Sequence, residues 1–382
     1  MSARAERWSP PDARLVTAAV ASAVFLVSWG LIHRGFYDER PIVDTGVYQS
    51  YGDKIRAGQV PYRDFDVEYP PGALPVFAAP SFAPADDYVP AFEWLMAALG
   101  VVLVVVVGSI SPAAAAFVAV SPLLVGSLLL SRFDLWPALL SAGSVVALLR
   151  GRHRLGWGLL GAAVAAKLYP LVLVGPALAW SWRRGRARAA GAGLVVLAAV
   201  VLPFLVIAPD GVWRSVHGQA SRPLQVESIG AAALQVFGDP RVETSHGSQN
   251  VVGHGAVATA LVVAQALAVL AVWALAWRRP EDLPRWAAAA VAAFVAFGKV
   301  LSPQFLVWLV PLVPLVRGRR GVGATAVLAT ALLLTQVWFP RRYWDYVGTG
   351  ERASAVLARD LALVALFALL ATPLRRERTR TT

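Results

Sequence analysis

Apolar runs separated by short polar segments follow one another along almost the whole chain. An α-helix needs about 20 mostly apolar residues to cross the roughly 30 Å of bilayer hydrocarbon. Several of these runs are shorter, so we expect tight or broken helical hairpins among them. The pattern predicts an all-α polytopic membrane protein with about 12 transmembrane helices, near residues 14–33, 88–108, 111–130, 133–150, 154–168, 169–182, 190–208, 253–277, 283–300, 302–316, 322–340 and 355–374.

Two apolar segments need a separate interpretation. The first run, 14–33, follows a short basic start and lacks a clean small-residue cleavage site, which predicts an uncleaved signal anchor. The segment 71–84 is short and rich in proline, and counting it as a span would invert the side of every later arginine cluster. We therefore expect it to be re-entrant or interfacial on the outer side.

The arginine residues predict the orientation. Twenty of the 35 basic residues fall in six short segments that share one side when the spans alternate from a cytoplasmic N-terminus: near 4–14, 150–154, 183–188, 278–285, 317–320 and 375–380. Short cytoplasmic segments carry such an excess of Lys and Arg. We expect both termini to be cytoplasmic and the whole chain, 1–382, to form one integral-membrane domain in the plasma membrane.

Three loops are left on the outer side, at about 34–70, 209–252 and 340–354, and two of them are long. Loops held by a rigid scaffold often carry binding and catalysis, so the active site is expected on the outer face. The second loop contains His217, Arg222, Glu227 and His246. Two interpretations of this loop stay open: it closes over an acceptor, or it only packs on the first loop.

The composition excludes several classes of protein. Hydrophobic residues make up 57% of the chain and charged residues 15%, well below the roughly 25% charged of soluble domains. The net charge of +12 is dispersed over the inner segments, which argues against nucleic acid as a partner. There is no cysteine, the five histidines show no zinc-binding spacing, and the phosphate-binding glycine motifs of nucleotide enzymes are absent.

The first outer loop contains a predicted amphipathic helix over residues 44–56. Val47, Tyr51 and Ile55 recur at intervals of four residues, which places them on one helix face. Asp44 stands immediately before these positions and is a candidate N-cap residue. Its position before the helix therefore leaves two roles open for Asp44: the N-cap of a surface helix, or a carboxylate that takes part in the reaction.

Five cations stand apart from the inner clusters, and two of them, Arg341 and Arg342, follow Pro340 on the outer side. Lys167 and Lys299 lie near predicted outer span ends, each close to a helix-breaking proline, and Arg132 lies in an outer turn. A charged group near a span end either extends to the lipid headgroups or lines a cavity, because an unpaired charge in hydrocarbon is costly. The second arrangement gives an anion-binding site.

Several motifs occur in a fixed order: Asp44 with Tyr48, GQVPYRDFDVEYPPG at 58–72, RFD at 132–134, AAKLYP at 165–170 and LSPQFLVW at 301–308. No one of them is specific. As an ordered set on a twelve-span background, they resemble the GT-C class of integral-membrane glycosyltransferases. More narrowly, the chain resembles glycosyltransferase family 87, the polyprenyl-phosphate-mannose-dependent mannosyltransferases of actinobacteria. Some relatives are expected to carry His near Gln304, and Gln cannot titrate near neutral pH.

The resemblance implies an inverting hexosyltransferase that moves a sugar, expected to be mannose, from a polyprenyl phosphate to a glycolipid or lipoglycan on the outer face. It implies Asp44 as the general base. It implies no cofactor, and cationic stabilisation of the phosphate leaving group in place of a metal. Besides membrane lipids, the expected partners are the two substrates. The expected substrate-binding residues are Lys167, Lys299 and Arg132 for the phosphate, with Glu68, Tyr69, Gln304 and Tyr48 near the sugar.

Other functions stay open at this point. A lipid or solute transporter or flippase of envelope biogenesis also has many spans and broken helices, although no duplicated half is evident in the hydropathy. A non-catalytic subunit of an envelope-building complex is the second alternative, and Asp44 would then be replaceable. The sequence also leaves open the sugar, mannose or a pentose such as arabinose, and the identity of the acceptor.

Overall fold

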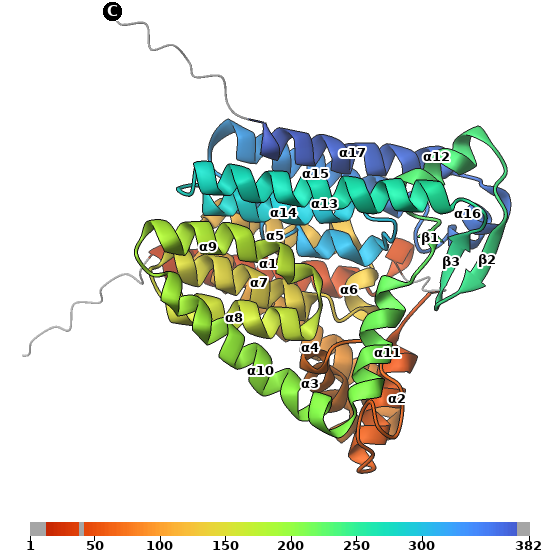
Figure 1. Ribbon diagram of the computed structural model, residues 1–382, viewed down its shortest axis with the longest axis horizontal. Helices are drawn as coiled ribbons and strands as arrows, with labels where there is room; N and C mark the ends of the chain where they lie inside the picture. Colours follow the sequence, from red (N-terminus) through yellow and green to blue (C-terminus); the bar gives the residue numbers. More distant parts are fainter. Residues whose placement is uncertain (1–12, 38–41, 373–382) are drawn as a thin grey trace, which may run out of the picture.

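The computed structural model describes residues 13–37 and 42–372. Long helices lie side by side along one common direction, and shorter elements gather at one end of this bundle (Figure 1). In the described residues the α-helices are α1 Ala13–Leu31, α2 Thr45–Arg56, α3 Leu74–Ala78, α4 Tyr88–Gly108, α5 Pro112–Val125, α6 Leu128–Ser131, α7 Leu135–Leu149, α8 His153–Ala166, α9 Val174–Arg183, α10 Ala190–Ile207, α11 Pro209–Ala220, α12 Ile229–Phe237, α13 Gly255–Arg278, α14 Leu283–Ala296, α15 Gly318–Gln336, α16 Tyr343–Thr349 and α17 Ala353–Ala371.

Short 3-10 helices connect or extend these elements: η1 Gly35–Tyr37, η2 Pro71–Ala73, η3 Ala79–Phe82, η4 Ala85–Asp87, η5 Tyr169–Leu173, η6 Ala187–Ala189, η7 Pro303–Trp308 and η8 Val313–Leu315. Two of them, η5 and η7, begin at or beside a proline inside predicted apolar runs. Proline lacks the backbone N–H that a continuing α-helix requires. The two runs are therefore broken helices, as their short lengths predicted.

Every predicted apolar run coincides with helical structure. Within the described residues, four segments are long and apolar enough to cross a membrane by length and composition: Tyr88–Gly108, Ala187–Ile207, Gly255–Arg278 and Ala353–Ala371. Five more apolar helical segments, such as Leu135–Leu149 and Leu283–Ala296, have only 10–17 residues. The many apolar helices confirm a mainly helical membrane protein, whereas the number of crossings stays a prediction.

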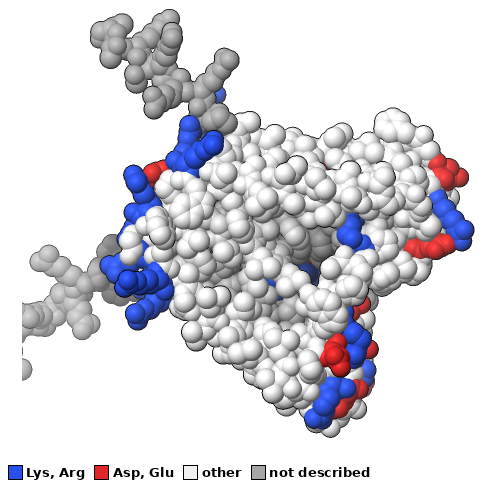
Figure 2. Space-filling view, in the orientation of Figure 1, with Lys and Arg blue, Asp and Glu red and all other residues white. Residues whose placement is uncertain are grey.

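The bundle has a buried centre and apolar outer helices. In α14 every residue except Phe294 is buried, whereas only Val272 and Ala276 of α13 are. An apolar helix that the rest of the protein does not cover is typical of a surface that faces lipid. Charged residues are almost absent from a broad band across the middle of the molecule and gather at its ends (Figure 2).

A small sheet at one end of the bundle corrects the all-α prediction. Strands β1 Leu224–Gln225, β2 Val242–Ser245 and β3 Ser248–Val251 form an antiparallel sheet in the order β1-β3-β2. All three lie in the predicted loop 209–252. The sheet packs beside α12 and α16 at the end of the bundle that carries α2 and α11 (Figure 1).

The segment 71–84 consists of η2, α3 and η3, and none of these is long enough to cross a bilayer. It packs against α2, α4 and the end of α8. Gly72 allows this approach, because a Cβ atom there would stand 2.6 Å from the backbone of Ala165. The first outer loop is thereby fixed against the residues that immediately precede Lys167.

Candidate functional site

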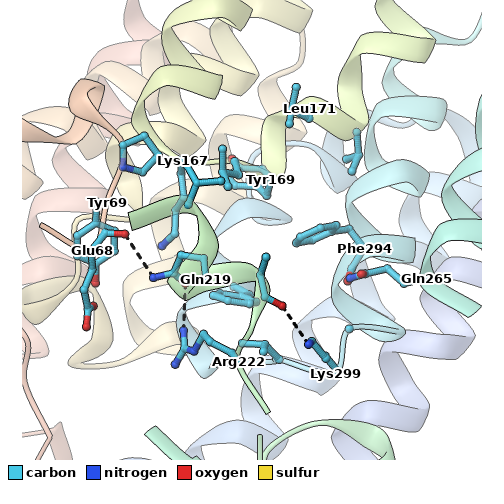
Figure 3. Close-up of a pocket in the computed structure, with 18 of the residues that line it drawn as sticks. Glu68, Tyr69, Lys167, Tyr169, Leu171, Gln219, Arg222, Gln265, Phe294 and Lys299 are labelled. Atoms are coloured by element: carbon cyan, nitrogen blue, oxygen red, sulfur yellow. Dashed lines mark hydrogen bonds between the residues drawn. The ribbon is translucent and has the colours of Figure 1, made fainter. Parts of the chain in front are cut away.

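A cavity of about 450 Å³ opens where the first outer loop, α11, α13 and α14 meet. It forms the hollow in the middle of the face in Figure 2, with basic side chains on its wall. Figure 3 shows side chains from both halves of the chain directed toward it. The lining residues are Glu68, Tyr69, Pro70, Lys167, Leu168, Tyr169, Leu171, Val172, Ser215, Val216, Gln219, Ala220, Arg222, Val262, Gln265, Phe294, Gly298, Lys299, Val300, Phe305 and Trp308.

Lys167 forms the innermost cationic centre of this cavity. It follows the last residue of α8, and its Nζ donates to Asp134 Oδ1 at 2.6 Å. Trp308 Nε1 donates to the same oxygen, also at 2.6 Å. The Lys167 side chain is 14% exposed and that of Asp134 2%. Lys167 is therefore a paired, buried ammonium that lines a cavity, and does not extend to the headgroups.

Aromatic rings surround the same ammonium. The Lys167 Nζ lies 4.7–5.9 Å from four ring centroids, those of Tyr69, Phe133, Phe305 and Trp308. The negative faces of such rings attract a cation. A fixed positive charge in a water-poor site interacts strongly with an anion, because the effective dielectric constant there is low.

Two further cations stand nearer the mouth of the cavity. Lys299 Nζ donates to the Ala220 carbonyl at 3.1 Å, and Arg222 Nη1 donates to Gln219 Oε1 at 3.4 Å (Figure 3). The backbone of Lys299 is fixed as well, since its carbonyl accepts the Gln225 N–H of β1 at 3.0 Å. The sheet that sequence patterns missed therefore holds one of the predicted phosphate-binding residues in place.

The opposite wall of the cavity is apolar. It consists of Leu171 and Val172 of η5, Val262 of α13 and Phe294 of α14. Because α13 is an outer helix with exposed Val262, this wall continues onto the surface that faces lipid. The cavity thus has a group of cations on one side and, on the other, an apolar wall that is open toward the lipid.

Asp44 lies outside the lining of this cavity. It occupies the N-cap position of α2, yet its side chain makes no capping hydrogen bond. The carboxylate instead forms an ion pair with Arg132, and Tyr48 donates its hydroxyl to Asp44 Oδ2 at 3.3 Å. The Arg132 side chain is 6% exposed and that of Asp44 28%. The capping role alone therefore does not describe Asp44.

The structure brings together four of the eight predicted site residues. Lys167, Lys299, Glu68 and Tyr69 all line the cavity. Tyr48 is buried and stacks on Phe77 at 4.5 Å, so it packs in the core beneath Asp44. The remaining residue in the sugar group, Gln304, accepts the Ser302 hydroxyl instead of lining the cavity.

Arg132 does not line the cavity either, although it is buried beside it. Its neighbour in the RFD motif, Asp134, accepts a hydrogen bond from Lys167. Arg132 pairs with Asp44, 88 positions away in the chain. The first and last residues of this short motif thus form ion pairs with different segments of the chain.

A second cavity of about 430 Å³ lies against the first. Its lining is Tyr51, Asp66, Val67, Glu68, Arg214, Ser215, Gly218, Gln219, Arg222 and His246. Four of these residues also line the first cavity: Glu68, Ser215, Gln219 and Arg222. The close approach of α11 to the first loop depends on Gly211, because a Cβ atom there would overlap the carbonyl oxygen of Tyr62.

Sequence patterns missed several residues of the two cavities. Gln265 is an amide in an otherwise apolar helix and donates to the Phe294 carbonyl at 2.6 Å; a polar residue inside a predicted span is a usable signal. Trp308 lay within a recognised motif without an assigned role. Asp66 and Arg214 form an ion pair at 3.0 Å between two outer loops, and no local pattern predicts such a pair.

No cluster of three or more His, Asp or Glu side chains suited to a metal ion occurs in residues 13–37 and 42–372. Whether the reaction needs a metal stays a prediction to test.

The family model of glycosyltransferase family 87 matches residues 68–303. No curated protein matches the chain. Among solved structures, the crystal structure of ArnT from Cupriavidus metallidurans in the apo state is similar to this chain, with a TM-score of 0.48 and 15% sequence identity, covering 94% of this chain and 76% of ArnT. Most of the first cavity falls within the family match, whereas Asp44 precedes it.

Proposed function

The chain belongs to glycosyltransferase family 87, and on that premise we propose that it transfers mannose from a polyprenyl phosphate to a glycolipid or lipoglycan. We place the reaction on the outer face of the plasma membrane. The arginine-rich end of the bundle is then cytoplasmic, as basic side chains predominate at one end and both signs of charge occur at the other (Figure 2).

One observation carries the proposal: the first cavity combines three cations with an apolar wall that continues onto a lipid-facing helix. Lys167, Arg222 and Lys299 supply the positive charge, and Val262 belongs to the apolar wall. A lipid phosphate has the complementary chemistry, an anionic group joined to a hydrocarbon chain. The volume of about 450 Å³ lies within the roughly 300–1,000 Å³ typical of small-molecule sites.

The proposed reaction is a single displacement. The acceptor hydroxyl oxygen bonds to the anomeric carbon of the sugar while the bond from that carbon to the phosphate oxygen breaks. The hydroxyl proton passes to the Asp44 carboxylate, and polyprenyl phosphate departs with the bonding electron pair. Lys167, Lys299 and Arg222 stabilise the charge that grows on the phosphate. One displacement at the anomeric carbon inverts its configuration.

The ion pair with Arg132 sets a condition on this role of Asp44. The guanidinium of Arg132 favours the ionised carboxylate, so Asp44 accepts a proton from the acceptor more readily when this pair is weakened. Glu68 is the second carboxylate to examine, because it is exposed and lines both cavities. The two carboxylates therefore form a matched pair for an experiment.

The test compares wild type, Asp44→Asn and Glu68→Gln in membranes supplied with radiolabelled polyprenyl-phosphate-mannose and native lipid extract. General-base catalysis contributes roughly 10²–10⁴-fold, so Asp44→Asn is expected to lose transfer by that factor at wild-type expression. Glu68→Gln is expected to retain measurable transfer with an altered KM. The reverse pattern assigns the base to Glu68.

A second arm separates the enzyme from the transporter. If the wild type labels no lipid from the mannose donor, the same membranes are supplied with polyprenyl-phosphate-arabinose. Transfer of arabinose alone corrects the sugar. Failure with both donors, together with movement of a labelled lipid across proteoliposomes, replaces the proposed transferase by a flippase.

A further inference from the structure

The second cavity differs from the first in its charge. Its charged and titratable lining residues are Tyr51, Asp66, Glu68, Arg214, Arg222 and His246. Two guanidinium groups therefore face two carboxylates, and Arg214 pairs with Asp66 at 3.0 Å. A cavity with balanced charge does not concentrate an anion, and its carboxylates repel a phosphate.

The same side chains suit hydroxyl groups. A hydroxyl donates one hydrogen bond and accepts others, so it can bind between a carboxylate, which only accepts, and a guanidinium, which only donates. Gln219 adds an amide that does both. The second cavity presents these groups to water, since the side chains of Asp66 and Arg214 are 79% and 58% exposed.

The position of the cavity fits a second substrate. A hydrogen bond between Gln219 Nε2 and the Glu68 carbonyl, 3.3 Å long and exposed, crosses the wall that the two cavities share. A ligand in the second cavity thus lies directly beside one in the first. No apolar wall like that of Leu171 and Val262 lines the second cavity.

We propose that the second cavity binds the neutral, hydroxyl-rich glycan end of the acceptor, next to the donor phosphate site. This assignment rests on the transfer reaction proposed above. The lipid part of a glycolipid acceptor stays outside this cavity, because Tyr51 and Val67 are the only large apolar residues in its lining. The cavity selects for the terminal sugar, and Asp66 and Arg214 act as residues that bind it.

The test uses purified protein in lipid nanodiscs with radiolabelled polyprenyl-phosphate-mannose and n-octyl α-D-mannopyranoside as a neutral acceptor. The readout is the ratio of mannose transferred to the octyl mannoside to mannose released into water. Asp66→Asn and Arg214→Gln are expected to lower this ratio at least about five-fold, since each removes a charged hydrogen-bonding partner of the acceptor. The Asp66–Arg214 pair is exposed, so its loss has little effect on folding.

Arg63→Gln is the matched control. Arg63 also belongs to an exposed Arg–Asp pair of the first outer loop, with Asp64 at 2.8 Å, and it lines neither cavity. The control is expected to keep the wild-type ratio. An unchanged ratio in both Asp66→Asn and Arg214→Gln overturns the assignment, as does an equal fall in the control.

Ligand binding without the donor separates this inference from the proposed reaction. Saturation-transfer NMR is recorded with methyl α-D-mannopyranoside, with inorganic phosphate added as a competitor. We expect a signal in the wild type that phosphate does not displace and that Arg214→Gln weakens. Such a signal with no transfer and no donor hydrolysis refutes the reaction but keeps the glycan site. Displacement by phosphate, or no signal in the wild type, overturns the glycan site.

Discussion

The two cavities share one wall and differ in almost every other respect. The first has the buried ammonium of Lys167, two less buried cations, aromatic rings and an apolar side that leads to lipid-facing α13. The second has exposed side chains of both signs and opens to water. The difference shows how burial changes what a charge does. Lys167 is fixed among rings at low dielectric, whereas the Arg214–Asp66 pair is screened by solvent.

The largest effect is expected in the first cavity, where a substitution removes the buried ammonium of Lys167. Lys167→Met removes the ammonium and leaves the Asp134 carboxylate buried without its cation. Such a loss costs about 3–5 kcal/mol, so we expect a markedly lower Tm together with loss of transfer. Thermal unfolding in nanodiscs and the radiolabel assay measure the two effects.

Two controls separate charge from packing at this position. In Lys167→Met combined with Asp134→Asn, the amide oxygen still accepts from Trp308 and no charge is stranded, so the Tm is expected to recover while transfer does not. Lys299→Met removes a less buried cation and is expected to raise the donor KM with a near-wild-type Tm. A wild-type Tm for Lys167→Met contradicts the buried pair.

The next effect concerns the scaffold behind the cavities. Burial raises the pKa of Glu227 from its ordinary value of 4.5 to about 7. The folded protein therefore favours the neutral carboxyl, and this contribution to stability is complete below the unfolded pKa and lost as pH rises through about 7. Glu227→Gln is neutral at every pH and is expected to be more stable than wild type at about pH 8, by at most about 3 kcal/mol.

Asp64→Asn is the matched control for this pH dependence. The Arg63 guanidinium lowers the pKa of exposed Asp64 to about 2. Asp64 therefore stays ionised from about pH 5 to about pH 8 in both folded and unfolded chains, and the variant is expected to show no pH-dependent change in Tm relative to wild type. Parallel Tm curves for wild type and Glu227→Gln over this range count against a neutral Glu227.

The smallest effect is expected at Arg222, in the wall that the two cavities share. Arg222 lines both cavities, so Arg222→Gln is expected to raise the KM of the donor and of the acceptor together. Loss of one charge-assisted hydrogen bond of about 1.5 kcal/mol corresponds to roughly tenfold for each substrate. Initial rates at varied donor and varied octyl mannoside give both constants. A change in only one KM places Arg222 in one site alone.

The sequence predicted the local elements well. The interval of four residues between Val47, Tyr51 and Ile55 predicted α2, which the structure has at Thr45–Arg56. The apolar run at 88–108 coincides with α4. These elements follow from hydrogen bonds and side-chain periods within a few residues of one another. The two-residue strand β1 had no such signal, because it exists only through pairing with β3.

In the candidate site, too, the sequence predicted individual residues but not the partners that they contact. Residue types and their order pointed to Lys167, Lys299, Glu68 and Tyr69, and all four line the first cavity. Their partners were not predictable, since Asp134 and Trp308 reach Lys167 from other segments. The pair of Asp44 with Arg132, and the pair of Asp66 with Arg214, likewise join loops far apart in the chain.

By itself the sequence determined a helical membrane protein, and it predicted that the basic segments share one side and that a few cations stand apart from them. Hydropathy, charge and helix breaks are properties of neighbouring residues, so they can be recognised in the chain alone. Only the tertiary structure decided which charges are buried, which carboxylate each cation pairs with, and that two cavities share α11. Burial and pairing depend on distances between segments, and the order of residues does not contain those distances until the chain has folded.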